Sequence, residues 1–217
     1  MLRSEACVDN TLMIFDTETT GIPSFRIPSD DPTQPHLVEL AMGEFTVPDL
    51  TPIWTYSRLV KPDGWTIPDE VAAIHGITTA IALADGEPLR EVVSQWWKLA
   101  SKCRYHLAFN ANFDKRIMRI ACLRCGASRD HIENMESKRI LLDPIGICTS
   151  ICQIPPTERM NAAGFRKPKT PKLSEAYQII VGKPMADAHQ ALGDITATRE
   201  IVLELIKRQK FAFPEFK

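Results

Sequence analysis

Hydrophobic residues occur along the chain in short runs, and their spacing predicts three strands near its beginning. The continuous apolar run 11–15 stops at Asp16, which indicates a buried central strand that ends there. Four prolines between residues 22 and 35 predict a loop. Two further apolar stretches, separated by a Pro48-Asp49 turn, predict strands at 37–47 and 53–60.

In the rest of the chain, apolar residues at helical spacing alternate with short apolar strands. Segment 88–102 repeats apolar residues at intervals of three and four, which predicts an amphipathic helix. Further elements are predicted as strands at 105–109 and 139–142, and as helices at 71–74, 112–125, a stretch ending at 151, 173–181 and 188–207. Residues 155–171, with four prolines, predict a long irregular loop. This order predicts a single α/β domain over residues 1–217, a mixed sheet flanked by helices.

Composition changes this picture little. The chain has 217 residues, of which 44% are hydrophobic, with 26 basic residues against 27 acidic ones and a formal net charge of −1. A nucleic-acid-binding surface would therefore have to be a local basic patch. No apolar run approaches the roughly 20 residues that span a bilayer, and residues 1–7 lack an apolar secretory core. We therefore expect a soluble, cytoplasmic protein with no membrane partner.

The six cysteines raise the alternative of a structural zinc site. Cys122 and Cys125 have zinc-like spacing, and Cys148 with Cys152 forms a looser second pair. Both pairs lie in apolar, helix-patterned stretches, where cysteine is an ordinary small core residue. This context favours reduced thiols in a reducing compartment.

Candidate chemistry comes from three separate segments, which together supply four acids and one histidine: 15–21, 110–114 and 189–194. Asp16 and Glu18 are two residues apart on a strand, so their side chains leave the same face and can reach one metal. Four acids gathered at one point repel each other, and a fold tolerates them when cations compensate the charge. Two divalent metals would do so, and such sites hydrolyse phosphodiesters.

The other two segments complete this candidate site. Asp114 begins a helix that follows a strand, where the chain can turn toward a neighbouring strand end. His189 and Asp194 are five residues apart on a helix, so the aspartate can bind metal while the imidazole lies over the adjacent water. Histidine titrates near neutrality and can accept the proton of that water. Hard carboxylate oxygens favour Mg²⁺ or Mn²⁺ over zinc.

The three segments resemble the motifs of the DEDD superfamily of exonucleases, in the subclass with a histidine in the third motif (DEDDh). Asp16-x-Glu18 followed by Thr19-Thr20-Gly21 is similar to the first motif, Asn110-x-Asn112-Phe113-Asp114 to the second, and His189-x4-Asp194 to the third. Segment 73–78 is also similar to part of the proofreading ε subunit of bacterial DNA polymerase III. Bacterial exonuclease X and small phage exonucleases are further likenesses.

The resemblance implies a ribonuclease H-like fold and release of 3′-terminal nucleotides as 5′-monophosphates. Asp16, Glu18 and Asp194 would hold a first metal ion, and Asp16 with Asp114 a second. His189 would be the general base. Residues that would contact the terminal nucleotide are Thr19, Thr20, Gly21, Ile74, His75 and Phe113.

The expected partner is nucleic acid, with single-stranded DNA 3′ ends preferred, in DNA repair or proofreading. A stand-alone enzyme is favoured over a proofreading subunit, and the oligomeric state is left open. One alternative is an RNase T-like or oligoribonuclease-like enzyme that trims RNA; another is a non-catalytic module that binds nucleic acid or a polymerase.

Several other residues were weighed. Asp187 fits the third motif less well than Asp194 and is expected to be a helix cap or a neighbour of the site. Lys115 and Arg116, beside Asp114, would add positive potential, and the basic loop 155–171 is a candidate for phosphate contacts.

Overall fold

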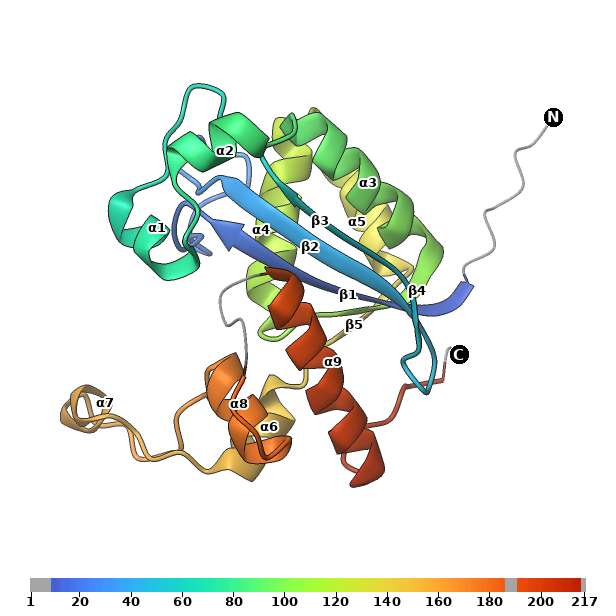
Figure 1. The fold of residues 1–217 in the computed structure, drawn as a ribbon, viewed down its shortest axis with the longest axis vertical. Coiled ribbons are helices and arrows are strands. Elements are labelled where there is room, and N and C mark those ends of the chain that lie inside the picture. Colours follow the sequence, from blue (N-terminus) through green and yellow to red (C-terminus); the bar gives the residue numbers. More distant parts are fainter. Residues whose placement is uncertain (1–8, 186–190, 216–217) are drawn as a thin grey trace.

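A computed structural model describes residues 9–185 and 191–215, which form one five-stranded mixed sheet with helices on both faces (Figure 1). The strand order is β3-β2-β1-β4-β5. The strands are β1 (Asp9–Thr19), β2 (Leu37–Thr46), β3 (Pro52–Leu59), β4 (Cys103–Leu107) and β5 (Ile140–Leu142). The pairs β1–β2 and β2–β3 are antiparallel, and the pairs β1–β4 and β4–β5 are parallel. The predicted single-domain mixed α/β architecture is confirmed.

Helices cover the two faces of the sheet unequally. The described helices are α1 (Asp69–His75), α2 (Thr79–Asp85), α3 (Leu89–Lys102), α4 (Ala111–Arg124), α5 (Arg129–Ser137), α6 (Ile145–Cys152), α7 (Glu158–Ala162), α8 (Leu173–Ile180) and α9 (Ala191–Lys207). Helices α3, α4 and α5 share the core of one face, and α9 covers the other. Helices α6 and α8 pack on α9 to form a satellite core.

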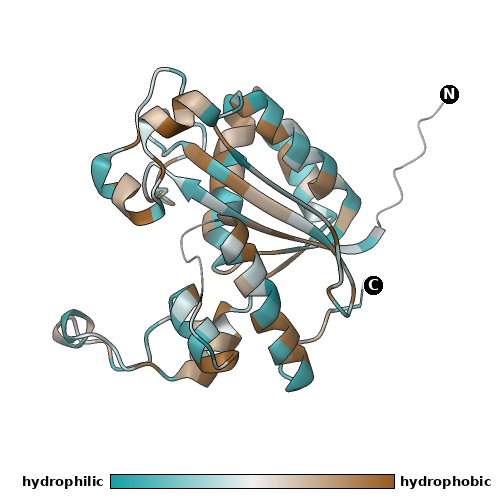
Figure 2. Cartoon of the chain, in the orientation of Figure 1, coloured by the Kyte–Doolittle hydropathy of each residue, from teal (hydrophilic) through white to brown (hydrophobic). Residues whose placement is uncertain are grey.

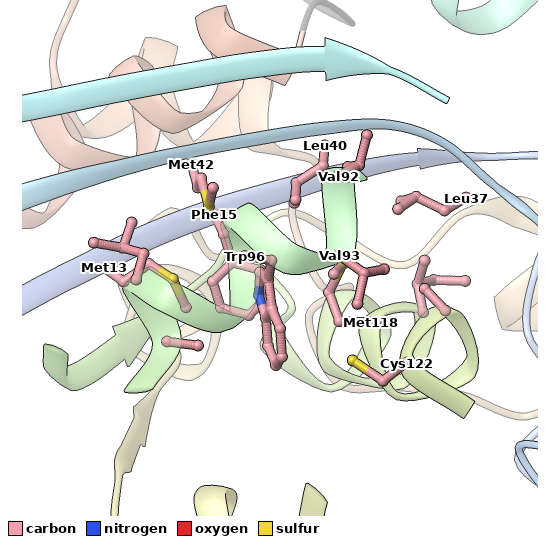
Figure 3. Packing of buried hydrophobic residues seen from close by; sticks show 14 of the residues in the cluster. Met13, Phe15, Leu37, Leu40, Met42, Val92, Val93, Trp96, Met118 and Cys122 are labelled. Atoms are coloured by element: carbon pink, nitrogen blue, oxygen red, sulfur yellow. The ribbon is translucent and has the colours of Figure 1, made fainter. Parts of the chain in front are cut away.

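Strand β1 is buried on both faces, and its side chains alternate between the two cores. Met13 and Phe15 pack with Trp96 and Met118, as Figure 3 shows, whereas Leu12 and Ile14 face α9. Figure 2 shows hydropathy along the chain: hydrophobic segments occur in the central strands, and the helices carry both hydrophobic and hydrophilic residues. Because a strand alternates every residue, Asp16 and Glu18 continue the row of Ile14 toward α9.

The structure departs from the predicted elements at a few places. Strand β1 continues past Asp16 to Thr19, because β2 pairs with it along its whole end, with a register shift after Glu18. Helices α2 and α5 were not predicted: both are short, and each buries only one or two residues. Within the predicted loop 155–171 lies the short helix α7. None of the described helices is long and apolar enough to cross a membrane.

The described cysteines are free thiols, and several belong to the core. Burial raises the pKa of both Cys122 and Cys148 to about 12, which keeps them protonated at neutral pH. Their side chains pack in two different hydrophobic clusters. They therefore behave as small core residues, in agreement with the favoured interpretation of the sequence.

Contacts between α9 and β1 predict a specific cost of core truncation. Ile195 is 1% exposed and packs against Leu12 and Ile14 of β1. We expect Ile195→Ala to lower the free energy of unfolding by about 2–5 kcal/mol, because it leaves a cavity at this contact. Urea denaturation measures the change. Thr196→Ala, at the exposed neighbouring position, is the control and should change stability by less than about 0.5 kcal/mol; equal effects would contradict the assignment of this face.

Candidate active site

Three acidic side chains converge between the end of β1 and the beginning of α9. One carboxylate oxygen from each of Asp16, Glu18 and Asp194 lies within 4.8 Å of the other two. Asp16 and Glu18 share the face of β1 that turns to α9, and Asp194 lies in the first turn of α9. We call these three residues the acid trio. They join two elements that are far apart in sequence.

Asp114 approaches the same strand from the opposite face of the sheet. Its Oδ1 accepts two hydrogen bonds from Thr17, one from the backbone N–H at 3.0 Å and one from Oγ1 at 2.7 Å. Strand β4 ends at Leu107, opposite Ile14, so β1 extends beyond its parallel neighbour. Beyond that point the Thr17 N–H has no β4 carbonyl opposite it, and Asp114, only 2% exposed, accepts its hydrogen bond instead. Thr17 thus links the fourth acid to the strand that carries two others.

The turn that delivers Asp114 is held by a carboxylate that the sequence interpretation missed. Asp143, directly after β5, accepts hydrogen bonds from the backbone N–H groups of Asn110 (3.2 Å), Ala111 (2.9 Å) and Ile145 (3.0 Å). Asn110 has a left-handed backbone, with φ of 69°, a conformation that asparagine tolerates better than most residues. Asp143 therefore caps the beginning of α4. An aspartate directly after the strand predicted at 139–142 was the available signal.

The acids raise one another's pKa values. Burial is the main cause of the increase for Glu18, whose pKa rises to about 8, and repulsion by Asp194, Glu39 and Asp114 adds to it. Burial likewise raises the pKa of Asp16 well above its ordinary value, helped by Asp114 and Asp194. Burial raises the pKa of Asp114 to about 7, although the bonds from Thr17 oppose the shift. Without compensating positive charge, the ionised cluster is thus unfavourable.

A fifth acid, Glu39, lies next to the cluster and was not singled out from the sequence. It is directly opposite Glu18 in the pairing of β1 with β2. Its Oε1 accepts a hydrogen bond of 2.6 Å from the Ser57 hydroxyl on β3. In the sequence, only the alternation of side chains along β2 indicated which face of the sheet Glu39 would lie on. Glu39 increases the local negative charge that cations must balance.

The donor set fits divalent metal ions. The acid trio offers three hard oxygen ligands within 4.8 Å of one another, the ligand type that Mg²⁺ and Mn²⁺ prefer. The raised pKa values of Asp16 and Glu18 give the electrostatic reason, since a bound cation would relieve both burial and repulsion. The charge of Asp114 also raises the pKa of Asp16, so the fourth acid belongs to the same electrostatic cluster.

The turn after the acids is tied to the beginning of β2. The Thr20 N–H donates to the His36 carbonyl at 3.0 Å, and Thr20 Oγ1 accepts from the His36 N–H at 2.8 Å. Thr19 Oγ1 donates to the Gly21 carbonyl at 2.6 Å. Residues Thr19, Thr20 and Gly21 therefore follow Glu18 directly in a fixed turn. His189 and Asp187 lie outside the described residues.

The other residues expected to contact substrate lie in different environments. Ile74, at the end of α1, is 58% exposed, whereas the neighbouring His75 is 7% exposed. Nδ1 of His75 accepts a hydrogen bond of 3.1 Å from the Ile77 N–H, which places that nitrogen within the turn after α1. Phe113 is half-buried and packs against the core beneath α3 and α4. Ile74 is thus the more accessible of the two neighbours on α1.

The basic residues beside Asp114 have structural partners. Lys115 forms an ion pair with Glu136 at 3.0 Å. Arg116 donates to the carbonyls of Ser24 and Ile27, and its guanidinium lies 5.6 Å from the centre of the Phe25 ring. These bonds fasten the loop after the first motif onto α4, a role that the sequence did not indicate.

Comparisons with known proteins show the family to which the chain belongs. The family model RNase_T, described as "Exonuclease", matches residues 13–202. A DNA polymerase III subunit epsilon-like protein of Rhodobacter capsulatus is 27% identical over 200 residues, which are 92% of this chain and 24% of the relative.

Solved structures of exonuclease I share the fold. Escherichia coli exonuclease I in complex with a dT13 oligonucleotide has a TM-score of 0.73 and 19% identity, over 93% of this chain and 42% of that one. Exonuclease I from Methylocaldum szegediense has a TM-score of 0.67 and 21% identity, over 94% and 41%. The chain spans about a quarter of the polymerase-like relative and about two-fifths of exonuclease I. From the family match and its ordered acidic motifs, the chain belongs to the exonuclease family, within the DEDD superfamily.

Proposed function

We propose that this protein is a metal-dependent 3′–5′ exonuclease that releases nucleoside 5′-monophosphates from single-stranded DNA ends. The acid trio carries the proposal, because three carboxylate oxygens within 4.8 Å of one another are a ligand set that suits divalent cations and phosphodiester hydrolysis. The family match over residues 13–202 supports it. Residues 1–217 would act as one exonuclease domain.

In the proposed mechanism the four acids hold metal ions. Asp16, Glu18 and Asp194 would hold one Mg²⁺ or Mn²⁺ ion, and Asp16 with Asp114 would hold a second. Divalent ions held there would supply polarisation of the scissile phosphate and a lower pKa of the attacking water. His189 would accept the proton of that water, as in the DEDDh subclass, and the 3′-oxygen of the preceding nucleotide would leave. Thr17 would keep Asp114 in place through the bonds at 2.7 and 3.0 Å.

Binding of the terminal nucleotide is proposed at the open end of β1. Thr19, Thr20 and Gly21 would line the terminal nucleotide, partly through backbone groups. Ile74, which is 58% exposed, would contact its sugar or base, with His75 behind it. Phe113 would pack beside the site. These six residues belong to the first-motif turn, α1 and α4.

DNA is proposed as the polymer because the relative named above is polymerase III epsilon-like and the exonuclease I structures hold deoxyoligonucleotides. The alternative is an RNase T-like or oligoribonuclease-like enzyme, since contact to a single 2′-hydroxyl distinguishes the two polymers. A non-catalytic module is disfavoured, because a scaffold gains nothing from acids that repel one another.

The activity itself is tested with matched DNA and RNA oligonucleotides labelled at the 3′ or the 5′ end. With Mg²⁺ or Mn²⁺, we expect stepwise shortening from the 3′ end, faster on single-stranded DNA. Asp16→Asn should lower the rate by at least about a thousandfold, because several kcal/mol of metal-derived stabilisation are lost. Asp130→Asn, an exposed acid on α5, is the matched control and should keep wild-type activity. Wild-type digestion by Asp16→Asn would refute the proposed chemistry; faster digestion of RNA would favour the alternative.

The contact between Thr17 and Asp114 predicts a positioning effect. Thr17→Val removes the hydroxyl donor at 2.7 Å but keeps the shape and the backbone bond. We expect kcat to fall roughly tenfold and the acid limb of the pH–rate profile to move to higher pH, because a carboxylate that loses a donor has a higher pKa. Thr17→Ser should restore both. A fall in kcat without the pH shift would indicate only a packing defect.

Metal binding and stability should be linked through Glu18. Its pKa is about 8 in the folded state against 4.5 ordinarily, so the folded metal-free protein loses stability as pH rises from about 5 to 8. Glu18→Gln cannot ionise, so in EDTA it should weaken this pH dependence and raise Tm at pH 8 by roughly 2–4 °C. Added Mn²⁺ should stabilise the wild type more than the variant. Thermal unfolding at several pH values tests this, and identical pH slopes for both proteins would contradict it.

A further inference from the structure

A basic arm, residues 155–171, connects α6 to α8 and stands apart from the sheet. Figure 1 shows it extending away from the body of the molecule, in the direction in which β1 runs. At its base, the Lys169 N–H donates to the Ile154 carbonyl at 2.9 Å, so the two sides of the arm meet there. Most of its residues are exposed. The arm therefore contributes surface rather than core.

The tip of the arm is an ordered turn. Thr157 Oγ1 accepts from the Met160 N–H at 3.3 Å and so caps α7. The Phe165 N–H donates to the Met160 carbonyl at 3.0 Å, and Arg166 donates to the Asn161 carbonyl at 2.8 Å. These bonds hold Phe165 and Arg166 in a defined position. A preformed tip loses less conformational freedom when it binds a partner.

The arm concentrates positive charge in a chain whose formal net charge is −1. It carries four basic residues and a single acid, Glu158. Lys169 forms an ion pair with Glu175 of α8 at 2.6 Å and thereby fastens the base. The other three bases are exposed and form no ion pair with any residue that the structure describes: Arg159, Arg166 and Lys167.

Next to these cations, Phe165 exposes 59% of its surface. An aromatic ring in water beside unpaired bases is the arrangement that proteins use for single strands, whose phosphates meet the cations and whose bases stack on the ring. A protein partner would need a larger apolar surface than one ring provides. Charge and stacking thus both favour a nucleic acid strand.

We propose that the arm binds the single strand of the substrate upstream of its 3′ end, with Phe165 stacked on a base. Arg159, Arg166 and Lys167 contact phosphates of the same strand. This inference rests on the proposed exonuclease function and adds a second, non-catalytic contact to it. Binding at the arm lengthens the segment of strand that the protein holds. It therefore increases the affinity for long substrates and does not change the affinity for a single nucleotide.

The test compares two substrates that differ in length. One is the p-nitrophenyl ester of thymidine 5′-monophosphate, which has no upstream strand, and the other is a single-stranded DNA of about 25 nucleotides, both with Mn²⁺. Phe165→Ala should raise KM for the oligonucleotide about tenfold, the expected loss of one stacked base, and leave kcat/KM for the ester unchanged.

A charge variant tests the phosphate contacts separately. In Arg159→Gln/Lys167→Gln, the bonds that Arg166 makes within the tip stay intact. The slope of log affinity against log salt for the oligonucleotide should become shallower by about 1.4, or about 0.7 per lost contact. Lys98→Gln/Lys210→Gln changes the net charge equally at exposed positions outside the arm and should keep the wild-type slope.

The outcomes separate the arm from the catalytic site. Wild-type KM and salt slope in both arm variants would overturn the proposal and leave the arm for another partner, such as an acidic protein surface. Loss of ester hydrolysis in the arm variants would also overturn it, because the effect would then reach the catalytic centre. If the wild type hydrolyses neither substrate, the proposed function fails; fluorescence anisotropy with the labelled oligonucleotide then still decides whether the arm binds a strand.

Discussion

Mutual repulsion among buried carboxylates is the constraint on which the other features of this site depend. Asp16 and Glu18 have raised pKa values because burial and neighbouring acids both disfavour their charged forms. A flexible chain would separate such groups. Here a strand that is buried on both faces holds two of them, and a packed helix supplies Asp194. The stability of the two hydrophobic cores therefore offsets an unfavourable arrangement that bound cations would relieve.

The topology of the sheet explains why the acids meet where they do. Strand β1 pairs with β2 up to its last residue. It extends beyond β4, whose pairing with β1 ends opposite Ile14. The free edge leaves the N–H of Thr17 without a strand partner, and Asp114 accepts it from the α4 side. Asp143, at the end of the next parallel strand, fixes the turn before α4. Parallel strands thus place their polar continuations at one edge, as in other open α/β sheets.

Opposite charges are separated in space along this molecule. The acids gather between the end of β1 and the beginning of α9, and the arm carries bases that form no ion pair within the described part of the chain. Lys115 and Arg116, although adjacent to Asp114 in sequence, are engaged by Glu136 and by loop carbonyls. A chain with almost no net charge can therefore still present a positive surface to phosphates on the arm, away from the acid trio.

The sequence by itself determined the local chemistry. Apolar runs predicted the central strands, and strand alternation put Asp16 and Glu18 on one face. These two conclusions depend on near neighbours, which periodicity and spacing describe. Asp114 and Asp194 were singled out by the resemblance to the exonuclease motifs. Only the tertiary structure decided that Thr17 binds Asp114, that Asp143 caps the preceding turn, and that Glu39 crowds the cluster. Such contacts join residues up to 97 positions apart, and their partners depend on where strands end and how helices pack.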